Sequence, residues 1–295
     1  METDSPIAIL TDFGLEDHYV GVLKGVINNI APAAQIIDVT HQIPPGDIQR
    51  AAVTLWQTKP YFPAGTIFLC VVDPGVGSDR SAVIVKSGHH IFIGPDNGIF
   101  SLVLESGYQV YELINPKYLL SGPSRTFHGR DIFAPAAAHA ACGVLPSKFG
   151  PKSSDLFLLP DPLLELHPPE TIRGQVLHAD RFGNLLTSLG CFQYQDSERI
   201  VLNPWIPLRD KRLLEIILNP KKLRIELPDG NSLSLVENFI QVPQGSCNAL
   251  VGSSQLLEIV ANQDNASRML NLFGGEMIQI KMPKMQGVIA WKNSL

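Results

Sequence analysis

Short apolar runs alternate with helix-spaced apolar positions in the first half of the chain. Runs of β-forming residues predict strands at residues 7–10, 36–39, 67–72, 82–86 and 90–93. Apolar residues spaced three and four apart predict helices at residues 19–30, 47–58 and 131–141. Strands that alternate with helices favour an α/β domain with a mostly parallel sheet.

The pattern changes after residue 148. Residues 149–169 contain five prolines and no long apolar period, which is typical of a link between domains. Beyond it, short strands are predicted at 223–227, 232–236, 249–251, 256–260 and 277–280, and the PDGN sequence between the first two is a strong hairpin signal. We therefore expect an α/β domain over residues 1–160 and an all-β, barrel-like or sandwich domain over residues 170–295.

Composition supports two domains and excludes several classes of protein. The 295 residues are 45% hydrophobic and 17% charged, which is ample for packed cores. A net charge of −5 argues against nucleic acid as a partner, and no apolar run is long enough to predict a membrane span. The first residues lack the pattern of a signal peptide, and the scattered cysteines (Cys70, Cys142, Cys191 and Cys247) form no CxxC motif among their apolar neighbours. We expect them to fill the core of a cytoplasmic protein.

The turn between the runs at 67–72 and 82–86 carries unusual chemistry. Its sequence is DPGVGSDR, residues 73–80. Pro74 and the glycines explain the change of chain direction. They do not explain a carboxylate, Asp73, placed where a buried strand leaves the sheet, or Arg80 seven residues later. The turn is thus either a solvated loop or part of a reaction site.

Other polar residues collect at the same end of the predicted sheet, where open α/β sheets bind ligands. These residues follow predicted strands or precede predicted helices: Asp12, Asp17, His18, Asp96, Asn97, His128 and Arg130. Each also has an ordinary structural explanation, as a turn residue, a helix cap or a solvated charge. Their shared position is what favours a site.

Three chemistries use such residues. A metal hydrolase would bring Asp12, Asp17, His18, Asp73 and His128 around one ion. A serine hydrolase is excluded because GxSxG is absent. The third is metal-free attack by an oriented water. Free water has a pKa of about 15.7, so this attack suits a substrate with a very good leaving group, such as a sulfonium.

Six ordered motifs make the chain similar to a known family. They are TDFGLEDHYVGVLKG, VVDPGVGSDR, IGPDNG, TFHGRDIFAPAAAHAACG, DRFGN and GSSQLLEIVANQDNA. Together they resemble the S-adenosylmethionine (SAM) hydroxide adenosyltransferases, the adenosine-forming SAM hydrolases related to fluorinases and chlorinases. The likeness extends over residues 7–282.

The resemblance implies a reaction and an assembly. Water or hydroxide attacks C5′ of SAM and yields adenosine and L-methionine, without metal or cofactor. The family's Asp–Arg–His set falls on Asp73, Arg80 and His128. The resemblance also implies an N-terminal α/β domain, a C-terminal β-barrel, and a homotrimer that binds SAM between the N-terminal domain of one subunit and the C-terminal domain of the next.

Substrate contacts are also implied. Asp12 would accept both ribose hydroxyls, Asp17 and Asp180 would hold the methionine ammonium, and Asn184 would read the adenine edge. Phe239 would pack on adenine, and Ser253 and Ser254 would hold the carboxylate. The chain departs from the family at Tyr19, where the halogenases often have a small hydroxyl residue, and at Gly252, Gln255 and Leu256 around the two serines.

Other functions remain open at this point. A halogenase would need a small uncharged pocket for halide, whereas Asp73 would repel the ion. A module that binds SAM or adenosine with little turnover would use the same contacts, and a metal-dependent phosphohydrolase would lose turnover on chelation. Product formation separates all of these from SAM hydrolysis.

Overall fold

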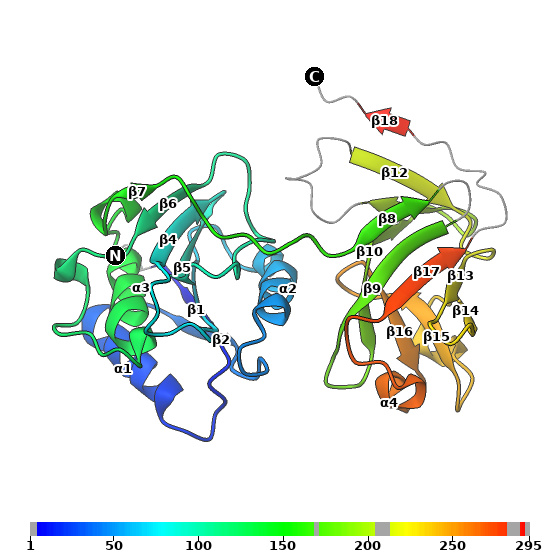
Figure 1. The fold of residues 1–295 in the computed structure, drawn as a ribbon, viewed down its shortest axis with the longest axis horizontal. Helices are drawn as coiled ribbons and strands as arrows, with labels where there is room; N and C mark the ends of the chain where they lie inside the picture. The colour runs from blue at the N-terminus through cyan, green and yellow to red at the C-terminus, as the bar shows by residue number, and fades with distance from the viewer. Residues whose placement is uncertain (1–4, 168–170, 204–212, 282–289, 293–295) are drawn as a thin grey trace. The chain divides into compact units, whose positions relative to one another are not determined.

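The computed structural model describes residues 5–167, 171–203, 213–281 and 290–292. The chain divides into two compact units, Met1–Leu159 and Pro160–Leu295, which we describe separately. Figure 1 shows the helices of the first unit and the strand-rich second unit.

The first unit contains a sheet with the strand order β2-β1-β3-β5-β4-β6-β7. β2, β1, β3 and β5 run parallel to one another, whereas β4, β6 and β7 join antiparallel. The strands are β1 (Ile7–Thr11), β2 (Ile36–Thr40), β3 (Ile67–Val71), β4 (Ala82–Ser87), β5 (His90–Pro95), β6 (Gln109–Glu112) and β7 (Lys152–Ser153). The predicted α/β class is confirmed.

Helices cover both faces of this sheet because its strands alternate between two cores. In β3, Ile67 and Leu69 face a core shared with α1 (Tyr19–Ile30) and α3 (Ala134–Ala141), whereas Phe68 and Cys70 face a core shared with α2 (Ile48–Thr58). Burial on both faces explains why these strands read as continuous apolar runs.

The predicted elements of this half lie where the pattern placed them, with additions. The helix expected at 131–141 begins earlier, as a π-helix, η3 (Gly129–Phe133), that continues into α3. Strands β6 and β7 were not predicted, since they are short and lie at the antiparallel edge. Three 3₁₀ turns complete the unit: η1 (Lys59–Tyr61), η2 (Pro116–Tyr118) and η4 (Pro146–Lys148).

Over the residues that the structure describes, the second unit is all β apart from α4 (Ala266–Leu270) and η5 (Phe239–Gln241), and its named strands pair antiparallel. Its strands are β8 (Leu164–His167), β9 (Thr171–Ala179), β10 (Leu185–Tyr194), β11 (Ile200–Asn203), β12 (Leu213–Leu218), β13 (Arg224–Glu226), β14 (Ser232–Ser234), β15 (Cys247–Val251), β16 (Leu256–Ala261), β17 (Met277–Lys281) and β18 (Ala290–Lys292).

Seven of these strands close into a barrel. The order β14-β13-β17-β9-β10 continues through β16 to β15. An isolated bridge between Leu235 and Ala249 then joins β15 back to the end of β14, and the Val236 N–H donates to Ala249 O at 2.8 Å. Ile225, Leu257 and Ile278 are buried in the core of this unit.

Two predictions for this half need comment. The PDGN hairpin is confirmed, with Gly230 at a φ of +86° between β13 and β14. The proline-rich stretch 149–169 is not wholly irregular, because β7 and β8 lie within it; Pro168 and Pro169 are outside the described residues. No helix among the described residues is both long and apolar enough to cross a bilayer.

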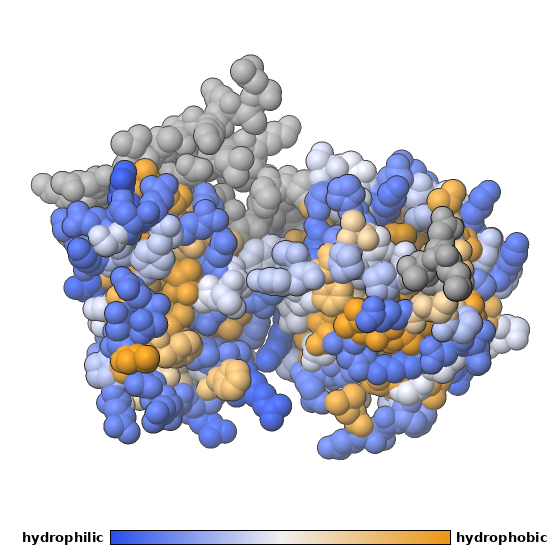
Figure 2. All heavy atoms as spheres, turned by 180° about the vertical axis from the view of Figure 1, so that it is seen from behind, coloured by the Kyte–Doolittle hydropathy of each residue, from blue (hydrophilic) through white to orange (hydrophobic). Residues whose placement is uncertain are grey.

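The surface retains apolar side chains in both units (Figure 2). In the second unit Phe182, Phe239 and Ile240 are exposed. Of the cysteines predicted to fill cores, Cys70 is buried but Cys142 is exposed, and all four are free thiols.

Candidate active site

The polar residues of the first unit gather at the switch point of the sheet. From β1 the chain crosses to β2 through α1, and then passes through α2 to β3 on the other side of β1. The connections that follow β1 and β3 therefore leave the sheet in opposite directions. The crevice between them, at the carboxyl ends of the two strands, is the usual ligand position in such sheets. Asp12 follows β1 directly, and Asp73 lies two residues beyond β3.

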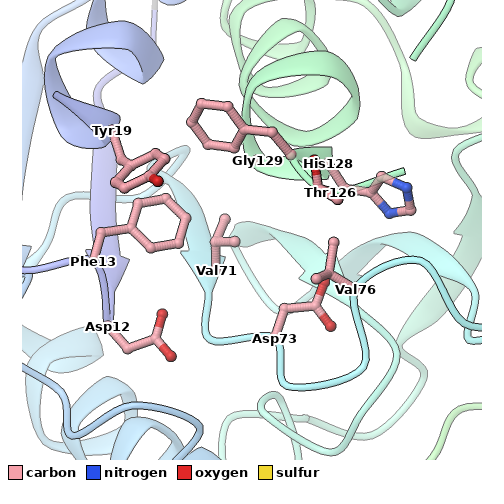
Figure 3. A pocket seen from close by; sticks show the side chains of 10 residues that line it. Asp12, Phe13, Tyr19, Val71, Asp73, Val76, Thr126, His128 and Gly129 are labelled. Atoms are coloured by element: carbon pink, nitrogen blue, oxygen red, sulfur yellow. The ribbon is translucent and has the colours of Figure 1, made fainter. Parts of the chain in front are cut away.

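A cavity of about 330 Å³ opens at this crevice (Figure 3). Its lining combines two carboxylates, an imidazole and apolar side chains: Asp12, Phe13, Tyr19, Val71, Asp73, Val76, Thr126, Phe127, His128 and Gly129. In Figure 3, Phe13 and Tyr19 lie on one side of Val71, and Asp73, Val76 and His128 lie on the other. The cavity has an aromatic side and a polar side.

Asp73, Arg80 and His128 are joined by direct hydrogen bonds. Arg80 Nε donates to Asp73 Oδ1 at 2.8 Å, and its terminal nitrogen Nη2 donates to Asp73 Oδ2. The same Nη2 lies 2.8 Å from His128 Nδ1. The side chains of Arg80 and Asp73 are 10% and 6% exposed, so this fork-shaped pair is largely withdrawn from water.

The geometry fixes the protonation of His128. A guanidinium has only donors, so His128 Nδ1 must accept from Arg80, and the imidazole is then neutral with its proton on Nε2. Burial and the adjacent Arg80 charge lower the pKa of His128 from its ordinary 6.5, which favours the same neutral form. The site thus has one ion pair and one neutral imidazole.

Local backbone geometry brings the three residues together. Gly77 has a φ of +79°, and a Cβ there would lie 2.6 Å from Arg125 O, so the turn packs against the segment that carries His128. The π-helix η3 begins directly after His128, and π-helical turns often occur at functional sites. Phe133, at the end of η3, places its ring 5.4 Å from the Arg80 guanidinium carbon.

Asp12 is half-buried, and the backbone of Gly46 holds its carboxylate. The Gly46 N–H donates to Asp12 Oδ2 at 2.8 Å, and Gly46 has a φ of +73°. Burial raises the pKa of Asp12, the Gly46 bond opposes this, and the Asp73 charge adds to the rise. The Asp12 side chain lines the cavity (Figure 3).

Beneath Asp12 lies a buried contact that the sequence did not indicate. Thr11 Oγ1 lies 2.8 Å from His41 Nδ1 and also accepts from the Phe13 N–H at 3.2 Å. His41 Nε2 lies 3.1 Å from Asp38 Oδ1, at ion-pair distance although its direction falls short of a hydrogen bond. These contacts fix the turn that presents Asp12.

Some predicted residues lie away from the cavity. Asp17 is exposed just before α1 and is not among the lining residues, although Tyr19 is. Asp96 Oδ1 accepts from the Phe157 N–H at 2.8 Å, and Asn97 Nδ2 donates to Val72 O at 2.8 Å. The PDNG motif therefore supports the end of β3 from outside the cavity.

In the second unit, Asp180 and Asn184 form one hairpin turn between β9 and β10. Asp180 Oδ1 accepts from the Phe182 and Asn184 N–H groups, each at 2.8 Å. Asn184 Nδ2 donates to Asp180 Oδ2 at 3.0 Å, and Asn184 is 8% exposed. Both residues thus help to build their own turn, and their predicted ligand roles stay predictions.

The remaining predicted residues lie in neighbouring turns of the same unit. Phe239 is 44% exposed in η5, and Ser253 and Ser254 lie in the turn from β15 to β16. That turn is closed by the Gln255 N–H, which donates to Gly252 O at 2.9 Å. Glu258 follows, and burial, with the Asp180 charge, raises its pKa to about 7.

The sequence analysis did not predict the aromatic side of the cavity. The sequence carries a signal for it, because Phe13 directly follows Asp12 and Phe127 directly precedes His128. Asp12 and His128 thus each have an aromatic neighbour in the chain. Over the residues that the structure describes, no group of three or more His, Cys, Asp or Glu side chains is placed to hold a metal ion.

Comparisons with known proteins identify a family that this chain matches. Residues 7–150 match the SAM hydroxide adenosyltransferase N-terminal domain and residues 174–279 match the corresponding C-terminal domain. A Thermus thermophilus protein named (R)-S-adenosyl-L-methionine hydrolase is 37% identical over 93% of this chain and 99% of its own length. A Nocardia brasiliensis fluorinase is 27% identical over 94% of this chain and 96% of its own.

A solved structure gives the same result for the fold. The crystal structure of an uncharacterised conserved protein from Thermotoga maritima aligns with a TM-score of 0.78 at 32% identity, covering 93% of this chain and 99% of that one. Two domain matches and a hydrolase relative above 30% identity are specific. The chain belongs to the SAM hydroxide adenosyltransferase family.

Proposed function

We propose that this protein hydrolyses SAM to adenosine and L-methionine. The observation that supports the proposal most directly is the hydrogen-bonded set of Asp73, Arg80 and His128 at the cavity. Family membership and the hydrolase relatives point to the same reaction. Water oxygen bonds to C5′, the C5′–S bond breaks with its electron pair going to sulfur, and one water proton is released.

The substrate suits a site without a metal or cofactor. The sulfonium leaves as the neutral thioether of methionine, so no acid is needed to assist its departure. The hydrolase relatives are named for the (R) epimer of SAM, and we include this sulfur configuration in the proposal.

Asp73 receives the water proton. His128 Nδ1 is occupied by Arg80, and Nε2 carries the imidazole proton, so neutral His128 offers the water a donor but no acceptor. Each Asp73 oxygen accepts from Arg80 and retains a lone pair for the water. Arg80 keeps its proton and holds both neighbours in place. A fixed carboxylate near the nucleophile also disfavours halide, which separates this site from a halogenase.

Asp12 binds the ribose. Its Oδ2 is oriented by Gly46, and the carboxylate faces the cavity on the β1 side of the crevice. A carboxylate with two oxygens suits the two adjacent ribose hydroxyls. This arrangement would place C5′ toward Asp73 and His128.

The other contacts are part of the same proposal. Asp17 and Asp180 hold the methionine ammonium, Asn184 reads adenine, Phe239 packs on its face, and Ser253 and Ser254 hold the carboxylate. In this proposal the protein is a cytoplasmic homotrimer, and the second unit of a neighbouring subunit supplies the last five residues.

Hydrolysis in ¹⁸O-labelled water tests the proposal. The purified protein is incubated with the (R) and (S) epimers of SAM separately, and products are separated by chromatography and weighed by mass spectrometry. Adenosine with ¹⁸O at the 5′-hydroxyl, together with unlabelled methionine and faster turnover of the (R) epimer, is expected. A 5′-halogenated nucleoside in fluoride or chloride, a methylated product, or loss of turnover with chelator would overturn the assignment.

A further inference from the structure

Three aromatic side chains form one wall of the cavity, which we call the aromatic wall: Phe13, Tyr19 and Phe127. The Tyr19 and Phe127 rings meet edge to face, 5.3 Å apart at 90°. The Phe13 ring lies 5.9 Å from Tyr19 and 6.1 Å from Phe127. The three rings thus support one another around Tyr19.

Part of the Tyr19 side chain on this wall is accessible to a ligand. It is 40% exposed although it is a large aromatic residue on the first turn of α1. Its hydroxyl makes no hydrogen bond to any residue that the structure describes, and its ring stacks on His18 at 4.7 Å. The ring is therefore held by aromatic neighbours rather than by its polar end.

The wall faces the polar set from the other side of the cavity. Figure 3 places Phe13 and Tyr19 beyond Val71 from Asp73 and His128. In a displacement reaction the entering oxygen and the departing sulfur lie on opposite sides of carbon. If Asp73 and His128 hold the water, the sulfur of the bound substrate faces the aromatic wall.

An aromatic wall is suited to that sulfur. Ring faces attract cations within about 6 Å of their centroids, and the sulfonium is a cation with polarised methyl and methylene groups. After the reaction the thioether is neutral and keeps only the weaker sulfur–aromatic contact. The carboxylates Asp12 and Asp73 lie at the ribose and water positions, so the rings can hold sulfur without pairing it to an anion that would retard its departure.

We propose that Tyr19 is a specificity-determining residue whose ring recognises the positively charged sulfur of SAM. The inference rests on the proposed function and deepens it. The aromatic ring is the recognising group; the phenolic hydroxyl is not.

Binding measurements separate charge recognition from packing. In an Asp73→Asn background, in which turnover is slow, the dissociation constants of SAM, S-adenosylhomocysteine and adenosine are measured by calorimetry. We expect Tyr19→Leu to lower the preference for SAM over the uncharged thioether by ~10-fold. Tyr19→Phe, and Tyr61→Leu at a 77% exposed tyrosine elsewhere in the unit, should leave that preference unchanged. Unchanged adenosine binding in each variant reports an intact ribose site.

Several results would overturn the inference. Equal weakening of SAM and S-adenosylhomocysteine would make Tyr19 a packing residue, and a loss with Tyr19→Phe as large as with Tyr19→Leu would assign the role to the hydroxyl. If the wild type releases labelled adenosine but Tyr19→Leu keeps full preference, only this inference fails. If SAM does not bind the Asp73→Asn protein and the wild type releases no adenosine, the proposed function fails with it.

Discussion

The two units treat their polar residues differently. In the first unit, Asp73 and Arg80 from one turn bond to each other, and Arg80 also bonds to His128, 48 residues further along the chain, at a cavity. In the second, Asp180 and Asn184 bond to each other within one five-residue turn. The bonds of the second set close a hairpin turn, whereas in the first set the bond between Arg80 and His128 joins segments that are far apart in the chain.

This difference separates residues that are placed for a ligand from residues that stabilise a turn. Long-range side-chain bonds that leave lone pairs facing a cavity are organised for a ligand. Short-range bonds in which a carboxylate accepts from backbone N–H groups of its own turn stabilise that turn. Such residues affect binding through the shape of the turn. We therefore expect substitutions in the Asp73, Arg80 and His128 set to act on the reaction, and those in the turns of the second unit to act on stability and affinity.

The largest effect is expected for Asp73→Asn. The change keeps the shape of the side chain and removes the proton acceptor, so kcat should fall by about 10³-fold. Adenosine binding should stay within about twofold, because Asp12 and Gly46 remain in place. Steady-state kinetics and calorimetry provide the two readouts.

Asp79→Asn is the matched control for that variant. Asp79 is an exposed carboxylate in the same turn, and wild-type kinetics are expected. Comparable losses in the two variants would mean that the charge of the turn matters rather than the bond to Arg80, and the contrast between the units would lose its main support.

Asp12→Asn should act on affinity. The amide oxygen can still accept from Gly46, but a neutral amide binds two ribose hydroxyls less well than a carboxylate. We expect KM to rise by roughly 10- to 100-fold, from the about 1.5–3 kcal/mol of hydrogen bonds to a charged group. A fall in kcat with unchanged KM would instead place Asp12 with the reacting groups.

Most of the first unit could be predicted from the sequence, for a physical reason. Its strands are buried on both faces and its helices are amphipathic, so local patterns such as 19–30 carry the fold. The Asp–Arg–His set came from strand-end positions and motif resemblance. What could not be predicted was the contact of Thr11 with His41, since their separation of 30 residues leaves no local signal.

The second unit was less predictable. Strands β9 and β10 were missed because they carry polar and small residues, such as Gly174 and Ser188, whose burial depends on distant barrel partners. Closure through the Leu235 and Ala249 bridge is likewise a long-range event. The DRFGN motif was found, but the sequence could not show that its Asp180 and Asn184 bond to each other.

A smaller effect is expected from pH, through His128. Its pKa lies below 6.5, and protonation would remove the acceptor that Arg80 uses and set two cations side by side. Turnover should therefore fall about tenfold per unit as pH drops below that pKa, and should be independent of this group above 6.5. The pH profile of kcat measures it.

His128→Gln sharpens the pH experiment. Glutamine offers an oxygen to Arg80 and an amide donor to water, so it imitates neutral histidine without titrating. The acid limb should disappear from the profile of this variant. A wild-type midpoint above 6.5 would contradict the neutral imidazole and favour a charged one beside Asp73.

The smallest effect concerns stability in the second unit. Burial and the Asp180 charge raise the pKa of Glu258 from 4.5 to about 7, so between these values the folded protein holds a proton that the unfolded chain releases. The stability contributed by the neutral carboxyl is present below pH 4.5 and is lost as pH rises to about 7. Glu258→Gln should thus be more stable than wild type at pH 8 by about 1–2 kcal/mol, with little difference at pH 4.5.

Urea unfolding at the two pH values provides the measurement, and Glu237→Gln, at an exposed glutamate, is the control that corrects for lost net charge. Equal gains for Glu258→Gln at both pH values would mean that packing against Gly252, rather than the carboxylate charge, limits stability. A gain confined to high pH would show that the ionised Glu258 carboxylate, on β16 of the barrel, destabilises the second unit.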